Sequence, residues 1–213
     1  MADVAKKTRC PTLPDLVAHF LYDQHTPVNT SRVDVDPSRY PRLMGKVYSY
    51  TFATAIFYAS SDPSVTGGMC RQCIYTTPLW RNTGLEQYDC IFAEKNPTLP
   101  SFQGIFVAQV LHLFDFHFQN QLYPCALVHW FDTIGDKPCI NIGMWMVQPE
   151  YDDQGASVLS VIHLDSIMWP AHLIGIYGAN SIPRDLHFSD SLSAFSASYI
   201  NKYLNYHAYK LAF

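Results

Sequence analysis

The feature that most constrains the fold is a series of short β-prone segments that begins at Lys46 and ends at Tyr177. The segments are rich in valine, isoleucine, tyrosine and phenylalanine, which fit a pleated strand well. The first segment, residues 46–59, is expected to form one strand or a tight strand pair. The other expected strands fall within Arg71–Tyr75, Gln87–Glu94, Gly104–His117, Tyr123–Phe131, Gly143–Gln148, Ser157–Asp165 and His172–Tyr177. Pieces rich in turn-forming residues, such as 60–68 and 150–155, lie between them.

Short strands connected by turns favour an antiparallel sheet, because a parallel sheet needs helical crossovers that this region does not provide. The segment Tyr123–Phe131 is largely apolar on both of its alternating faces, which is typical of a strand covered on both sides. The sequence therefore predicts a mainly β protein built on an antiparallel β-barrel with flanking helices.

Helical spacing occurs only near the two ends of the chain. Apolar residues three and four apart predict a helix over Leu13–Gln24, followed by a wrapping loop over Thr26–Gly45. A second helix is expected over residues 189–210, capped by Ser189 or Asp190. We expect a single domain over residues 1–213: helix and loop over 1–45, barrel over 46–178 and helix over 189–210.

Composition narrows the classes of partner. The chain has a net charge of -4 and only 15% charged residues, which disfavours strong nonspecific binding to nucleic acid. Its start lacks the apolar run of a secretory signal, and no segment reaches the roughly 18 apolar residues of a membrane span. We therefore expect an intracellular protein whose six cysteines are reduced thiols.

Candidate catalytic and metal-binding groups are few. Cys70 and Cys73 have the spacing of half a zinc site, but the other half is missing, so no metal or cofactor is expected. Strand alternation places His112 opposite to Asp115 and His117. The alternative function is a metal-dependent hydrolase or nuclease, whose site would draw on histidine and aspartate side chains. The candidate residues are His112, Asp115, His117, His163 and Asp165.

Aromatic and basic side chains leave two binding hypotheses open. Aromatic rings could form a cage for a methylated lysine, although core packing accounts for most of them. The candidate rings are Trp80, Tyr88, Phe131, Trp169 and Tyr177, together with Tyr123, Trp130, Trp145 and Tyr151, the four assigned to a binding surface. A basic strip could contact DNA, although the acidic net balance favours ordinary solvated charges. Its members are Lys6, Lys7 and Arg9 near the start of the chain, and Arg32, Arg39, Arg42 and Lys46 in the loop.

An ordered series of segments carries a resemblance to a known family. The series is VYSYTFATAIFYASSDPSVTGGM, TTPLWRNTGLEQYDCIFAE, GIFVAQVLHLFDF, YPCALVHWF, GMWMVQPE, SVIHLDSIMWPAHLIGIYG and SASYINKYLNYHAYKLAF. Together, from about Phe20 to Phe213, these segments resemble the C-terminal region of Plavaka-type transposases, which are encoded by DNA transposons of fungal genomes. Residues Asp89–Gly178 also resemble, in pattern, the small β-barrel of BAH domains, which bind histone tails and other proteins.

The resemblance implies a noncatalytic role. In Plavaka-type transposases the DDE nuclease region lies upstream of the part that this chain resembles, so no carboxylate is assigned as catalytic. We expect an interaction module with an SH3/BAH-like barrel and a protein or chromatin partner. Nucleic-acid binding is expected to be weak or absent, and no membrane or small-molecule partner is expected. The expected location is nuclear if the transposase relation holds and cytoplasmic otherwise.

Overall fold

The computed structural model of the chain describes residues 2–26, 39–58, 69–80, 85–94, 105–177, 186 and 191–204. The helices are α1 (Ala2–Lys7), α2 (Leu13–His25) and α3 (Ser191–Ala194). The strands are β1 (Val47–Tyr50), β2 (Phe52–Tyr58), β3 (Met69–Trp80), β4 (Leu85–Tyr88), β5 (Cys90–Glu94), β6 (Ile105–Phe118), β7 (Gln121–Thr133), β8 (Met146–Pro149), β9 (Leu159–His163), β10 (Ile167–Ala171), β11 (Leu173–Gly175) and β12 (Ser198–Ile200). A short 3-10 helix, η5 (Leu164–Ser166), separates β9 from β10. The protein is mainly β, as its sequence predicts.

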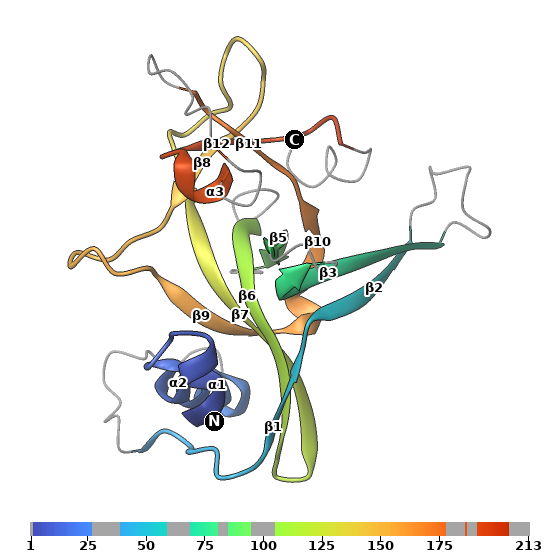
Figure 1. Cartoon of the computed structure of the whole chain (residues 1–213), viewed down its shortest axis with the longest axis vertical. Coiled ribbons are helices and arrows are strands. Elements are labelled where there is room, and N and C mark those ends of the chain that lie inside the picture. The colour runs from blue at the N-terminus through green and yellow to red at the C-terminus, as the bar shows by residue number, and fades with distance from the viewer. Residues whose placement is uncertain are drawn as a thin grey trace.

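The strands β6 and β7 form a long antiparallel hairpin at the centre of the molecule (Figure 1). Gln119 and Asn120 connect them, with φ angles of 49° and 63°. Two consecutive positive φ angles are the requirement of a type I′ turn, whose twist matches that of the flanking strands. On the outer edges of the hairpin, β1 and β5 pair with β6, and β8 and β9 pair with β7.

The sheet curls into a nearly closed antiparallel barrel, which confirms the predicted architecture. β9 pairs with β7, and after the bend at η5 the chain continues as β10, which pairs with β5 on the far side of the hairpin. Apolar side chains fill the interior. They are Ile74, Ile91, Ala93, Ala108, Val110, Leu113, Ala126, Val128 and Trp130, with Ile162, Leu164 and Ile167 packed against them.

A β-bulge in β6 changes which residues face the interior. The register with β7 shifts between Val110 and His112. As a result, Val110 and Leu113, three positions apart, both pack in the interior, although strict alternation would place them on opposite faces. The extra residue leaves Leu111 and His112 together on the other side of the strand.

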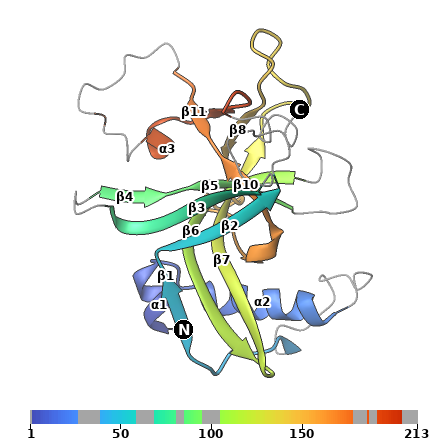
Figure 2. The same cartoon turned by 90° about the vertical axis from the view of Figure 1, so that its right-hand side faces the viewer.

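Helices α1 and α2 cover one outer face of the barrel (Figure 2). In α2 the fully buried residues Leu13, Val17 and Leu21 repeat every four positions, which places them on one side of the helix. They pack against Phe114 and Leu127 of the central hairpin. The helix predicted over Leu13–Gln24 is therefore confirmed.

The predicted C-terminal helix over 189–210 is wrong for most of the described part of this segment. Only Ser191–Ala194 is helical, and Ser198–Ile200 forms β12, which pairs with β8 and β11. Ile200 is fully buried in a third apolar cluster with Phe92 and Trp169. Helical spacing reflects only a weak local preference. Here the backbone hydrogen bonds to two neighbouring strands and the burial of Ile200 outweigh it.

Strands β2, β3 and β4 form a second sheet that projects from the barrel (Figure 1). The segment over 46–58 forms two strands in different sheets, because β1 pairs with β6 whereas β2 pairs with β3. Asp89, between β4 and β5, ties the two sheets together. Its carboxylate accepts hydrogen bonds from the Tyr75 backbone N–H at 2.8 Å and from the Gln87 side chain at 2.9 Å.

Some predicted loops fall outside the described residues. The turn expected over 60–68 lies there, as does most of the loop expected over 26–45, of which Thr26 and residues 39–45 are described and contain no α-helix or strand. None of the helices in the described residues is long and apolar enough to cross a membrane.

Two leucines of β7 provide a matched test of the packing between the helices and the barrel. Leu127 is fully buried against the helices, whereas Leu122 is 47% exposed. We expect Leu127→Ala to lower the free energy of unfolding by about 2–5 kcal/mol and Leu122→Ala by less than about 1 kcal/mol, measured by urea denaturation. Equal effects of the two substitutions would contradict the burial described above.

Candidate functional site

The structure does not bring the four candidate aromatic residues together. Tyr123 is buried beneath α2, and Trp130 is buried in the barrel interior. Trp145 is half-buried against the third apolar cluster, and Tyr151 is 57% exposed with its ring beside His129. The prediction of one aromatic surface is therefore wrong, because Tyr123 and Trp130 serve as core residues in two different clusters.

The histidine and aspartate set is divided between two faces of the sheet. Cys125 pairs with both Phe114 and His163, so His163 lies on the face that carries His112 and Phe114. Asp115 lies on the opposite face, as strand alternation predicts, and its carboxylate accepts a hydrogen bond from the Tyr50 hydroxyl at 2.7 Å. The five residues of the metal-dependent hypothesis therefore do not converge.

Other candidate ligands are also separated. His163 and Asp165 form a local pair, with Nδ1 and a carboxylate oxygen 3.3 Å apart. Cys73 is a free thiol, and the side chain of Cys70 lies outside the described residues. Within the described segments no group of three or more histidine, cysteine, aspartate or glutamate side chains is placed to hold a metal ion.

The three basic loop residues that the structure describes are exposed. Arg39, Arg42 and Lys46 lie on the segment that leads into β1, and Arg32 lies outside the described residues. These positions stay compatible with either a DNA contact or ordinary solvated charges.

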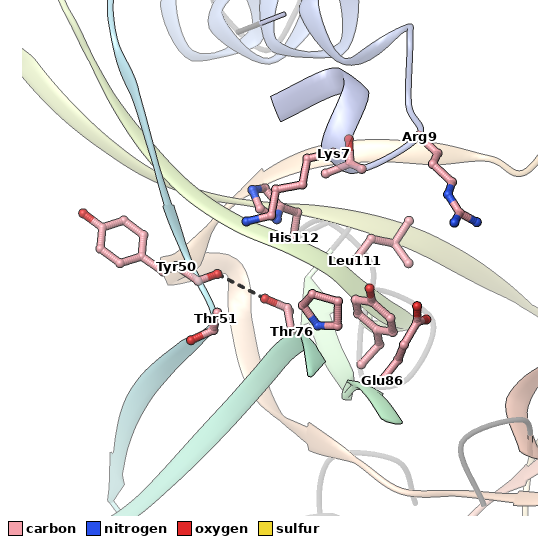
Figure 3. A pocket seen from close by; sticks show the side chains of 11 residues that line it. Lys7, Arg9, Tyr50, Thr51, Thr76, Glu86, Leu111 and His112 are labelled. Atoms are coloured by element: carbon pink, nitrogen blue, oxygen red, sulfur yellow. Dashed lines mark hydrogen bonds between the residues drawn. The ribbon is translucent and has the colours of Figure 1, made fainter. Parts of the chain in front are cut away.

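A pocket of about 310 Å³ opens where the end of α1 meets both sheets (Figure 3). Lys7, Thr8 and Arg9 come from the α1 end, and Leu111 and His112 come from the bulge in β6. The opposite side is formed by Tyr50 and Thr51, by Thr76 and Pro78 of β3, and by Glu86 and Tyr88 of β4. Thus segments from four distant parts of the chain build this pocket.

The backbone at the end of α1 places two cations at the pocket. The Cys10 N–H donates to the Ala5 carbonyl at 3.0 Å and the Arg9 N–H donates to the Lys6 carbonyl at 3.3 Å, which is the hydrogen-bond pattern of a Schellman motif. Arg9 occupies the left-handed position of this motif, with φ of 54°, where glycine is preferred. A non-glycine residue there costs about 1 kcal/mol or more, so the fold holds Arg9 in an unfavourable conformation at the pocket.

His112 forms part of the pocket wall beside Lys7 (Figure 3) and is 5% exposed. Its Nε2 lies 3.0 Å from the Ser49 hydroxyl, and its ring stacks on Phe114. Burial, with a smaller contribution from the Lys7 charge, lowers the pKa of His112 from 6.5 to about 4. The imidazole is therefore neutral at physiological pH.

A serine hydroxyl bonded to a histidine is also the start of a nucleophile and base pair. A pKa of about 4 makes His112 a weak proton acceptor at neutral pH. No carboxylate of the described residues forms a hydrogen bond with this ring to orient it. The pair of Ser49 and His112 is thus better suited to holding the pocket wall than to activating a nucleophile.

The β4 side of the pocket carries mixed polarity. Burial raises the pKa of Tyr88, and the negative charge of Glu86 raises it further, whereas the positive charge of Arg9 opposes them. Glu86 and Arg9 therefore act on the same tyrosine from opposite sides of the pocket. The sequence identifies Lys7 and Arg9 only as members of a basic strip, because nothing local to them signals that β3, β4 and the β6 bulge meet them.

Comparisons with known proteins found no match: no family model, no curated protein and no solved structure resembles this chain significantly.

The depressed pKa of His112 predicts acid sensitivity. Between pH 6.5 and about 4 the unfolded chain binds a proton at His112 that the folded protein does not, so folding stability falls as the pH falls through this window. Between pH 7 and pH 4, we expect the wild type to lose on the order of 2 kcal/mol more stability than His112→Gln, allowing for partial solvent screening. Urea denaturation at the two pH values measures this difference. Equal losses of stability in the wild type and in His112→Gln would contradict a neutral buried imidazole.

Proposed function

We propose that this chain is a noncatalytic interaction module that binds a protein partner by accepting an acidic side chain in the pocket between α1 and β4. The observation that carries the proposal is the placement of Lys7 and Arg9 at one concave site built from both sheets. The origin in a Plavaka-type transposase, and with it a nuclear or chromatin partner, follows from the sequence resemblance alone and is part of the same proposal.

The cations of the pocket favour a carboxylate. Neither Lys7 nor Arg9 forms a salt bridge with any residue that the structure describes. A charge-assisted hydrogen bond contributes about 1.5–3 kcal/mol, and a guanidinium can bind both oxygens of a carboxylate at once. The neutral His112 and the hydroxyls of Thr8 and Thr76 add polar surface without adding charge.

The surrounding charges favour a protein ligand over nucleic acid. Glu86 lies in the pocket wall, and the chain has a net charge of -4, so a polyanion would meet repulsion beyond the two cations. Nucleic-acid binding surfaces usually extend a basic track along several phosphates. A compact pocket with two cations and one carboxylate instead suits a single acidic side chain whose neighbouring backbone N–H groups donate hydrogen bonds to Glu86.

The test uses a fragment of the ligand. We expect N-acetyl-glutamate methylamide to shift the backbone amide resonances of Lys7, Thr8 and Arg9 in an NMR titration, and the matched glutamine compound to bind at least about 5-fold more weakly. Lys7→Gln should weaken binding of the glutamate compound by a similar factor. Equal binding of both compounds, or shifts elsewhere only, would refute the proposed site.

Arg9→Gly separates binding from folding. Glycine relieves the left-handed strain at position 9, so we expect stability to stay the same or to rise by up to about 1 kcal/mol while binding of the glutamate compound is lost.

A 12-base-pair DNA duplex provides the second comparison. Duplex binding that weakens steeply with salt and is stronger than that of the glutamate compound would favour nucleic acid over a protein partner.

A further inference from the structure

Strand β2 is one of the two edge strands of the projecting sheet, and β4 is the other. The sheet order is β2, β3, β4, and no other strand among the described residues pairs with β2. The Thr76 N–H donates to the Thr51 carbonyl at 2.8 Å, which sets the hydrogen-bonding phase of the pair of strands. Because bonded and non-bonded pairs alternate along antiparallel strands, the N–H and C=O groups of Phe52, Thr54 and Ile56 point away from β3. The edge therefore offers three donor and acceptor pairs to another strand.

A groove of about 500 Å³ runs between this edge and the barrel. Ala53 and Ala55 of β2 leave it open because their side chains are small. Across from them lie Leu164 of η5 and Ile167 of β10, and Ile74 of β3 also lines the groove. The groove is thus bordered on one side by unpaired backbone and on the other by apolar side chains, which is the arrangement that accommodates an extended peptide.

The edge lacks the devices that usually block strand pairing. The sequence of β2, FATAIFY, contains no charged residue, proline or glycine. Phe52 and Ile56 are 52% and 64% exposed. Proteins normally protect exposed edges with lysine, proline or a bulge, so an uncharged apolar edge indicates a surface that another chain covers.

The charge at the groove indicates the chemistry of that chain. Asp165 is the single formal charge among the residues lining the groove, and its side chain is 91% exposed. A lysine or arginine on the bound segment would face it. A second copy of this chain fits less well, since β2 itself has no cation to place opposite Asp165.

We propose that β2 accepts an extended peptide segment of a partner as an added strand, with apolar side chains in the groove and a basic side chain opposite Asp165. This site lies apart from the pocket that contains Lys7 and Arg9, and it does not depend on the function proposed for that pocket.

The test measures a defined peptide and two protein variants. The probe is the fluorescein-labelled, amidated heptapeptide Thr-Val-Thr-Lys-Thr-Val-Thr, in which strand alternation places both valines and the lysine on one face, and its control carries glutamate in place of lysine. By fluorescence anisotropy we expect the lysine peptide to bind at least about 10-fold more tightly than the glutamate peptide. Asp165→Lys should reverse this preference, and Asp136→Lys, at an exposed carboxylate that does not line the groove, should leave it unchanged.

Thr54→Pro tests the backbone part of the proposal. Its N–H points away from β3, so proline is tolerated there as on other free edges, but it removes a donor that the added strand needs. We expect at least 10-fold weaker peptide binding, with Thr54→Ala as the matched control that keeps the N–H. If the proline variant does not fold, Asp165→Lys, at a side chain exposed to solvent, decides the proposal alone.

Amide hydrogen exchange gives an independent measurement. In the free protein the amides of Phe52, Thr54 and Ile56 should exchange faster than those of Ala53 and Ala55, and the lysine peptide should protect them. Protection of all five amides in the free protein, together with a dimer in sedimentation, would show that a second copy occupies the edge and would overturn the proposal. Binding that is indifferent to Thr54→Pro would overturn it too.

Discussion

The rest of the structure depends on the pairing of β6 with β7. This hairpin supplies both central strands of the barrel, and every other strand of the larger sheet pairs with it directly or through one or two neighbours. Its two faces are buried by different partners, since Phe114 and Leu127 pack under the helices while Leu113 and Ala126 pack in the interior. The type I′ turn sets the register, and a slip by one residue would exchange these two faces.

The bulge in β6 links the core to the proposed binding pocket. By adding one residue, it keeps Val110 and Leu113 in the interior and turns His112 toward the end of α1. The pocket also needs the left-handed conformation of Arg9. Both features depart from regular structure, and the surrounding packing holds both in place. Local irregularity maintained by a rigid framework is common where proteins bind ligands.

Much of the fold could be predicted because its signals are local. Strand alternation in Tyr123–Phe131 and helical spacing in Leu13–Gln24 reflect burial patterns that the sequence carries directly. β12 could not be predicted, since its strand conformation comes from pairing with β8 and β11. The candidate site was only partly predictable. Lys7 and Arg9 stood out as basic residues, but the aromatic residues chosen for binding, Tyr123 and Trp130, are core residues.

The sequence by itself determined the fold class, the first long helix and the alternation that separates His112 from Asp115, because each depends on residues within a few positions of one another. Only the tertiary structure decided which surfaces are concave and which described strand edges are unpaired. Both depend on the placement of residues far apart in the chain, since Arg9 and β4 border one pocket and β2 and η5 border the groove. No local pattern encodes a shape that forms only when distant segments pack together.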